Sequence, residues 1–175
     1  MRNFVIISVL LLTTSLFHNK VNAQFGAGAQ LGLFNPLGDG SADASFGVNL
    51  PVRFGITDEI NLGVNLGYYF SRTQVLGITT TGYTAPLLAT FEYKFGTNDF
   101  TPYASFDGGL YVLGFTGDIA SGNSSEIGIA PGAGGLYEIN RELFFDISFK
   151  YHLIFTEGTN NSSALGANLG IIYYF

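Results

Sequence analysis

One group of residue types in this chain could perform acyl transfer: His152, with Ser148 four positions before it and Glu157 five positions after it. A histidine that activates a serine hydroxyl, with a carboxylate to orient the ring, is a recurrent hydrolytic arrangement. Ser148 and His152 are separated by an even number of residues, so in a strand they share one face. The alternative is a hydrogen-bonded interior histidine, which we favour because the alternation described below turns His152 inward.

Other charged residues fall inside apolar segments rather than between them. Because polar and apolar residues alternate in these segments, we expect the charged side chains to share an inner face. A buried charge is tolerated only when it is paired and hydrogen-bonded, so we predict a network of ion pairs concentrated toward one end of the interior. We interpret this network as structural packing, with a proton or ion pathway or a gate as the alternative. The predicted members are Arg53, Glu92, Lys94, Asp107, Glu138, Asp146, Lys150 and His152.

The composition argues against several classes of function. The formal net charge is −6, whereas nucleic-acid binding needs a basic surface. The chain has no cysteine and only two histidines, so it lacks the ligands for a zinc site built from several Cys or His residues. The acidic, glycine-rich connections have turn composition without the regular ligand spacing of a calcium loop. We therefore expect no cofactor, no metal site and no nucleic-acid partner.

The N-terminus predicts a secretory signal peptide. Arg2 precedes an apolar run from Phe4 to Phe17, and Ala23 ends a short segment suited to cleavage. This run is too short for an α-helix that crosses a bilayer, which needs roughly 20 residues. We expect residues 1–23 to be the signal peptide and residues 24–175 to form one domain.

The domain has the pattern of β-strands. No helical periodicity persists for three turns, and apolar residues alternate with a period of two. Long connections rich in Gly, Ser, Thr and Asn (35–43, 72–82, 116–126 and 156–163) alternate with short ones (56–59, 96–101 and 140–142), which is typical of bacterial outer-membrane barrels. We predict an all-β fold, an eight-stranded antiparallel up-and-down transmembrane β-barrel. Its strands are expected at 25–34, 44–55, 60–71, 83–95, 102–115, 127–139, 143–155 and 164–175.

The alternation also assigns the two faces of most strands. In the segment 143–155 the apolar residues occupy every odd position, which turns Asp146, Lys150 and His152 inward. In the fifth and sixth segments the alternation is ambiguous, and we choose the phase that turns Asp107 and Glu138 inward. Aromatics near the strand ends, among them Phe54, Phe115 and Phe175, are expected to form two interfacial girdles. An eight-stranded barrel is about filled by its own side chains, so no open pore is expected.

The end of the chain resembles the C-terminal strand of Gram-negative outer-membrane β-barrels. In ALGANLGIIYYF, apolar residues alternate up to a terminal phenylalanine. The resemblance implies that the barrel-assembly machinery reads this segment during biogenesis. The residues that carry this implied assembly signal are Leu169, Ile171, Tyr173 and Phe175.

Two repeats of strand, tight polar turn and strand, RFGITDEINLGVNLGYYF and GGLYEINRELFFDISFKYHLIF, extend the resemblance. They look like the small OmpA/OmpX and opacity-type outer-membrane β-barrel family, porin-like in architecture. Members are structural proteins, adhesins, virulence factors or, occasionally, lipid-modifying enzymes. The sequence stops at Phe175, so we expect no peptidoglycan-binding domain like that of full-length OmpA.

We therefore expect an integral protein of the cell outer membrane with a structural or surface-interaction role, such as adhesion, and no enzymatic activity. The alternatives are a lipid-modifying enzyme that uses His152 and a narrow channel for ions or small solutes. The expected partners are outer-membrane lipid, lipopolysaccharide and the barrel-assembly machinery, and the expected state is a monomer.

Overall fold

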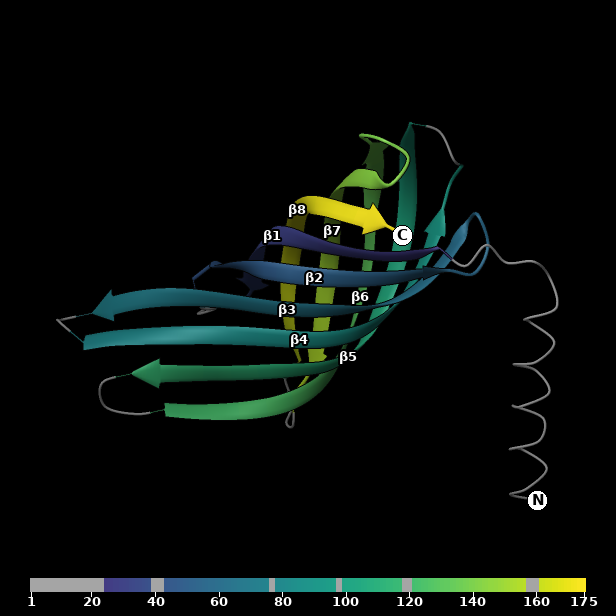
Figure 1. Cartoon of the computed structure of the whole chain (residues 1–175). Coiled ribbons are helices and arrows are strands. Elements are labelled where there is room, and N and C mark those ends of the chain that lie inside the picture. The colour runs from purple at the N-terminus through teal and green to yellow at the C-terminus, as the bar shows by residue number, and fades with distance from the viewer. Residues whose placement is uncertain (1–23, 39–42, 76–77, 97–98, 118–120, 157–160) are drawn as a thin grey trace, which may run out of the picture.

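Eight antiparallel strands close into a barrel in the computed structural model of the chain (Figure 1). The structure describes residues 24–38, 43–75, 78–96, 99–117, 121–156 and 161–175, so the predicted signal peptide lies outside the described residues. No helix in these ranges is long and apolar enough to span a membrane. The strands are β1 (Phe25–Leu37), β2 (Ser45–Gly55), β3 (Ile60–Val75), β4 (Ile78–Lys94), β5 (Phe100–Gly117), β6 (Ser121–Glu138), β7 (Leu143–Phe155) and β8 (Ser162–Tyr174).

Each strand pairs with its neighbours in sequence order, and β1 pairs with β8 to close the barrel. The closing register runs from Gly26 opposite Tyr174 to Leu37 opposite Ser163. Closure leaves no free edge along this seam, which is how β-structure satisfies its backbone within a membrane. The predicted eight-stranded antiparallel barrel is confirmed.

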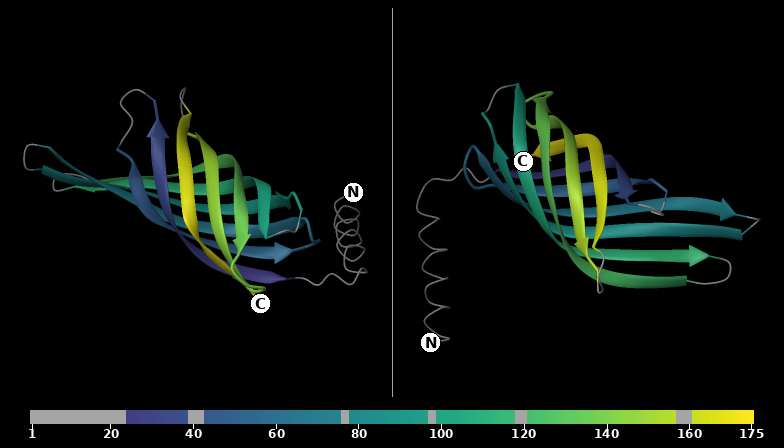
Figure 2. Two further views of the ribbon diagram at one scale, coloured as in Figure 1. Left: turned by 90° about the horizontal axis from the view of Figure 1, so that it is seen from above. Right: turned by 180° about the vertical axis from the view of Figure 1, so that it is seen from behind.

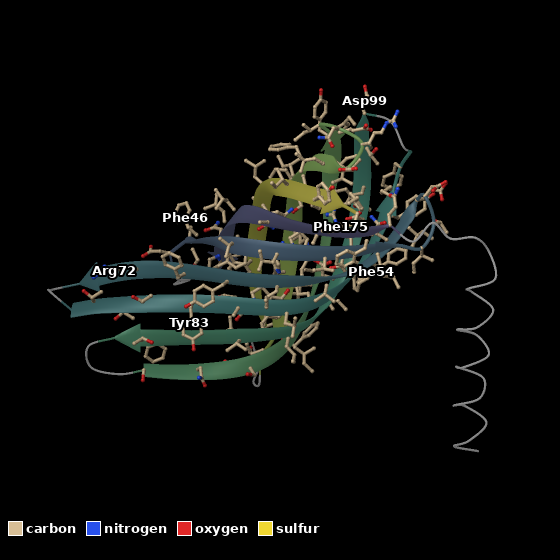
Figure 3. All side chains as sticks on the ribbon, in the orientation of Figure 1. Phe46, Phe54, Arg72, Tyr83, Asp99 and Phe175 are labelled. Carbon is tan, nitrogen blue, oxygen red and sulfur yellow. The ribbon has the colours of Figure 1, made fainter. Side chains whose placement is uncertain are left out.

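Apolar side chains cover the outside of the barrel. Leu50, Leu66 and Leu87 follow one another across β2, β3 and β4, and all three are about half exposed. Figure 3 shows Phe46, Phe54 and Phe175 on this outer surface. An outer row of this kind suits hydrocarbon, where a charged side chain at the midplane would cost about 2 to 4 kcal/mol.

The phase of β5 and β6 is the one that turns Asp107 inward. Asp107 is fully buried, and its paired neighbour Ala130 on β6 is buried as well. The same phase turns Phe115 to the inner face, where it pairs with Gly122 and remains 45% exposed. The expectation that Phe115 belongs to the outer aromatic girdle is wrong, because the unbroken register of β5 gives Phe115 the inward parity of Asp107 and Tyr111, and its ring lies against Gly122 on that face.

Two of the predicted long connections are wrong in extent. Residues 72–82 and 116–126 lie mostly in the hairpins β3–β4 and β5–β6, which continue to the pairs Val75–Ile78 and Thr116–Ser121. The polar Thr, Ser and Asn residues there suggested loops, but hydroxyl-bearing β-branched residues also suit strands outside the membrane. Figure 2 shows that β3 to β6 therefore extend as a sheet beyond β1, β2, β7 and β8.

Short turns close the opposite end, where the described chain begins and ends. In the turn between β2 and β3, Thr57 Oγ1 accepts a hydrogen bond from the amide of Ile60 at 3.0 Å. In the turn between β6 and β7, Asn140 Oδ1 accepts one from the amide of Leu143 at 2.9 Å. The turn after β4 uses Gly96, whose φ of +105° favours glycine. By the usual asymmetry of bacterial barrels, this end is periplasmic.

A glycine pair offers a test of how closely the strands approach. A Cβ on Gly170 of β8 would overlap the backbone of Ala29 and Gln30 on β1, whereas a Cβ on Gly108 would meet its nearest atoms only at 3.9 Å. We predict that Gly170→Ala lowers the free energy of unfolding by about 1 to 3 kcal/mol, because the strand backbone cannot yield as a side chain would. Urea unfolding in lipid vesicles, followed by heat-modifiable gel migration, measures this loss. The matched variant Gly108→Ala should stay within about 0.5 kcal/mol of the wild type. Equal stability of the two variants would contradict the close approach at the closing seam.

Candidate functional site in the barrel interior

Asp146 of β7 is the centre of the polar cluster inside the barrel. The residue is fully buried, and its carboxylate accepts hydrogen bonds from Gln30 Nε2 at 2.7 Å, Arg53 Nη2 at 2.8 Å and Tyr103 Oη at 2.7 Å. These donors come from β1, β2 and β5. A carboxylate with three donors is well compensated for the loss of water, so Asp146 ties four strands together across the lumen.

Arg53 links Asp146 to a second carboxylate. Its Nη2 lies 3.0 Å from Glu92 Oε2, and Glu92 Oε1 accepts a hydrogen bond from Asn61 Nδ2 at 2.7 Å. The guanidinium also lies over the Tyr103 ring, 5.1 Å from its centroid. Arg53 stands near the start of the barrel, opposite Gly26 on β1, so this cluster lies toward the periplasmic end.

A second ion pair lies farther along the barrel. Lys150 Nζ of β7 pairs with Asp107 Oδ2 of β5, and both side chains are buried. A row of neutral polar groups crosses the lumen nearby, because Asn49 Nδ2 donates to Gln30 Oε1 at 2.6 Å and to Asn65 Oδ1 at 3.2 Å. In the middle of the interior, the charged side chains thus lie beside opposite charges, and the amide side chains lie beside hydrogen-bonding partners.

His152 lies closer to the extracellular end among aromatic rings. Its Nδ1 is hydrogen-bonded to Tyr111 Oη at 2.8 Å, and its ring centroid lies 5.0 Å from that of Phe34. Ser148 has a different partner, since its Oγ accepts a hydrogen bond from Asn168 Nδ2 at 3.5 Å. No described hydroxyl nucleophile other than Tyr111 is hydrogen-bonded to His152, and Glu157 lies outside the described residues. This geometry is that of an interior histidine rather than an activated serine pair.

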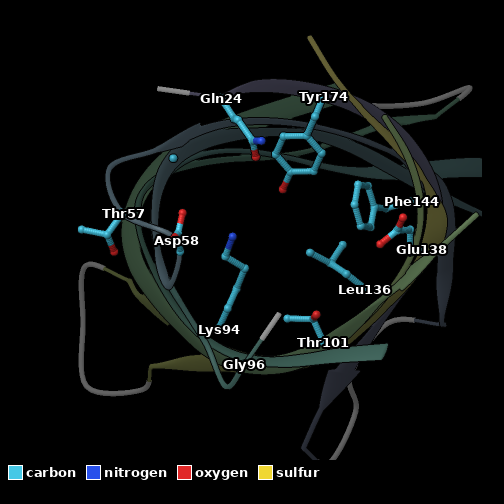
Figure 4. A pocket seen from close by; sticks show the side chains of 11 residues that line it. Gln24, Thr57, Asp58, Lys94, Gly96, Thr101, Leu136, Glu138, Phe144 and Tyr174 are labelled. Carbon is cyan, nitrogen blue, oxygen red and sulfur yellow. The ribbon is translucent and has the colours of Figure 1, made fainter. Parts of the chain in front are cut away.

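Lys94 and Glu138 are separate from the two ion-paired clusters. Both line a cavity of about 350 Å³ at the periplasmic mouth, together with Asp58, Leu136 and Tyr174 (Figure 4). They are the last inward residues of β4 and β6, where the interior opens, and neither makes an ion pair within 4 Å with a described residue, although the charges of Glu92 and Arg53 act on Lys94. The expectation of one network that includes them therefore needs revision: the interior holds two buried ion-paired clusters, and these two residues border an open cavity.

Sequence reasoning missed the neutral partners of the cluster. Tyr103 and Tyr111 share the inward parity of Asp107, and this parity is the signal that could have identified them. Gln30 and Tyr69 could have been found in the same way from the alternation of β1 and β3. No group of three or more His, Cys, Asp or Glu side chains among the described residues is arranged to hold a metal ion.

The four residues of the implied assembly signal lie on the outer surface. Leu169, Ile171, Tyr173 and Phe175 are all exposed, and the Phe175 amide donates to the Phe25 carbonyl at 2.8 Å. The Phe175 ring also lies 5.4 Å from the Phe25 ring. The chain end is therefore fastened to the first strand at the closing seam.

Solved structures with the same fold are outer-membrane barrels. Neisserial surface protein A has 15% sequence identity and a TM-score of 0.70, with 86% of this chain and 97% of that chain covered. Ail, the attachment invasion locus protein of Yersinia pestis, has 15% identity and a TM-score of 0.61, with 87% and 97% covered. The N-terminal β-barrel domain of Pseudomonas aeruginosa OprF has 17% identity and a TM-score of 0.61, with 88% and 100% covered.

At these identities the likeness shows the fold alone. No curated protein sequence matches the chain. The family profile described as "Outer membrane protein beta-barrel domain" matches residues 4–175, nearly the full length. The resemblance inferred from the turns and the terminal strand is thereby confirmed, as is the location. The chain belongs to the outer-membrane protein β-barrel domain family and resides in the outer membrane.

Proposed function

We propose that this protein is a surface-interaction protein whose barrel is a closed support for an extracellular sheet. The observation that carries the proposal is the continuation of β3 to β6 beyond the other four strands (Figure 2). Beyond Phe70, β3 has no described partner on the β2 side, and β6 has none on the β7 side before Ile127. A barrel that only filled the membrane would not need this extension.

The extended sheet has the surface of a water-exposed binding region. Its residues on both faces are mainly Thr, Ser, Gly and Asn, and Ser121 to Ser125 are all exposed. Phe115 adds a half-exposed ring on the inner face, beside Gly122. Thr73 Oγ1 donates to Asp43 Oδ2 at 2.8 Å, which braces the β3 extension against the connection between β1 and β2. Hydroxyl and amide groups around an aromatic ring suit a neutral polar partner.

The charge of the extracellular end narrows the class of partner. Residues 35–44, 71–83, 114–127 and 155–164 contain one basic residue, Arg72, and the acidic residues Asp39, Asp43, Asp118, Glu126 and Glu157. The Ail structure was solved with the heparin analogue sucrose octasulfate. A polyanion of that kind needs a basic surface. We propose that the partner of the present chain is not a polyanion.

The filled interior favours a barrel that holds the extracellular sheet in place over a barrel that transports solutes. Asp146, Arg53 and Glu92 form one buried cluster, and Lys150 with Asp107 forms the next. Narrow eight-stranded barrels have little space left once such side chains are in place. The arrangement of His152 and Ser148 with separate partners likewise favours a protein without enzymatic activity. We extend the proposal to a monomer that contacts outer-membrane lipid and lipopolysaccharide and is assembled by the barrel-assembly machinery.

If the lumen is closed, the protein should not conduct. We predict that the folded wild-type protein in planar bilayers produces no stable ion current, because paired side chains occupy the interior from Arg53 to His152. The measurement is single-channel recording, with an open porin as the positive control for insertion. Long-lived steps of uniform conductance that scale with protein concentration would overturn the closed-lumen part of the proposal.

The polar cluster is predicted to stabilise the barrel. Asp146→Asn removes a charge that faces Arg53, and breaking a buried ion pair typically costs about 3 to 5 kcal/mol. Since Arg53 retains Glu92, we expect a loss near the lower end of that range, measured by urea unfolding in vesicles. Asp99→Asn, at an exposed turn, should change stability by less than about 0.5 kcal/mol. Unchanged unfolding of Asp146→Asn would show that the cluster is not structural.

Shortening the extended sheet should abolish surface interaction and leave the barrel intact. Because Arg72 pairs with Thr81 and Leu113 with Ser124, residues 73–80 and 114–123 can each be replaced by Asn-Gly, which closes a two-residue hairpin. We predict that Gram-negative cells displaying the full chain adhere to at least one of three targets: a cell monolayer, an immobilised neutral polysaccharide and cells of the same strain. Cells displaying the shortened chain should lose that adhesion.

The control is heat-modifiable gel migration: both chains should show the heat-dependent shift of a folded barrel, because residues of the membrane band are unchanged. Equal adhesion of full and shortened chains, or no adhesion of the full chain to any of the targets, would contradict the proposal.

A further inference from the structure

The cavity at the periplasmic mouth has a defined arrangement of charge. Lys94 enters it from β4, Asp58 from the turn between β2 and β3, and Glu138 from the end of β6 (Figure 4). In Figure 4, Asp58 and Glu138 stand on opposite sides, and the Lys94 amine points into the space between the walls. The cavity measures about 350 Å³, which is enough for several water molecules or one small solute.

None of these three charged groups forms an ion pair within 4 Å with a described residue, although the charges of Glu92, Asp58 and Glu59 act on Lys94. The ion pairs within 4 Å in the described part of the chain have Arg53 and Lys150 as cations, and none of their three carboxylate partners, Glu92, Asp146 and Asp107, lines the cavity. Lys94, Asp58 and Glu138 therefore face the same space without a close ion pair between them, and in a chain cleaved after Ala23 the new N-terminus at Gln24 would border it as well. This contrasts with the interior above it, where each charged group is matched.

The inner wall of the cavity holds a further unsatisfied group. Tyr174 lines the cavity and is only 7% exposed, yet its hydroxyl has no hydrogen-bond partner. Arg53 is the group of the chain that interacts with this hydroxyl, and its Nη1 is likewise without a hydrogen bond of normal geometry. A buried polar group without a partner costs about 1 to 3 kcal/mol, so a molecule that supplies an acceptor here gains from that deficit.

We propose that this cavity is a binding site for a small zwitterion of the α-amino-acid class, entering from the periplasm. The carboxylate of such a molecule would bind Lys94 Nζ and the Tyr174 hydroxyl, and its ammonium group would bind Glu138, with Asp58 at the rim. A simple anion would meet two carboxylates, and a simple cation would meet Lys94. A molecule with both charges can place its carboxylate at Lys94 and its ammonium group at Glu138. The site is independent of the extracellular sheet, so its failure leaves the proposed function untouched.

Two lysines make the test direct. Apart from Lys20 in the predicted signal peptide, the chain contains only Lys94 and Lys150. Lysine labelled with ¹³C at Cε therefore gives one reporter in the cavity and one internal reference in the buried pair with Asp107. The folded protein in lipid nanodiscs is titrated with glycine, acetate and methylammonium, each to about 100 mM, well above millimolar dissociation constants.

We expect glycine to shift the Lys94 signal in a saturable manner and to leave Lys150 unchanged. Acetate and methylammonium should bind at least tenfold more weakly, because each lacks one of the two charges. A flat Lys94 signal with glycine, or equal affinity for glycine and acetate, would overturn the proposal and leave a water-filled vestibule or a plain anion site, respectively.

Variants of Glu138 and Tyr174 test which group of the ligand each residue binds. Glu138→Gln should weaken glycine binding at least tenfold and leave acetate binding unchanged or stronger, since the ammonium partner is lost. Tyr174→Phe should weaken glycine and acetate alike. The controls are Asp43→Asn, an exposed carboxylate at the extracellular end, and Tyr173→Phe, on the outer surface. Loss of binding in the controls equal to that in the cavity variants would also contradict the site.

Discussion

Within the hydrocarbon of a bilayer no water is available to bond with backbone amides and carbonyls, so each must find a partner in the chain. For strands this requires a closed sheet, and closure here depends on the pairing of β1 with β8. The seam brings the two described ends of the chain together, where Phe175 is bonded to Phe25. Closure then divides every strand into a face toward lipid and a face toward a narrow interior.

The narrow interior imposes a second constraint. Charged side chains that turn inward lose water and must be matched, as Asp146 is by Gln30, Arg53 and Tyr103. Glycines such as Gly170 let neighbouring strands approach where a side chain would strike backbone. The polar groups and the close approach together leave a filled barrel. Chemistry that needs access to solvent is thereby displaced to the two ends, where the strands leave the membrane.

The two ends differ in construction. On the extracellular side four strands continue as a polar sheet, whereas on the periplasmic side short turns surround a cavity with Lys94, Asp58 and Glu138. Neisserial surface protein A has only 15% sequence identity to this chain, yet its structure matches with a TM-score of 0.70. A fold maintained at such low identity reflects the membrane constraint, and individual roles are carried by what each barrel presents at its ends.

The alternation of residues by itself determined the number of strands and which face of six of them meets lipid, because a period of two leaves little choice once one side must be apolar. In the fifth and sixth strands the charges of Asp107 and Glu138 had to decide the phase. The alternation also determined that Asp146, Lys150 and His152 turn inward. The composition led us to predict loops where the hairpins β3–β4 and β5–β6 extend, since threonine and serine suit both loops and exposed strands. The prediction that Phe115 lies in the outer girdle was also wrong. Only the tertiary structure decided that Arg53 joins Asp146 and Glu92 while Lys94 and Glu138 remain at the mouth. Such partners lie on strands far apart in sequence, and their meeting depends on barrel closure and stagger, which no local pattern encodes.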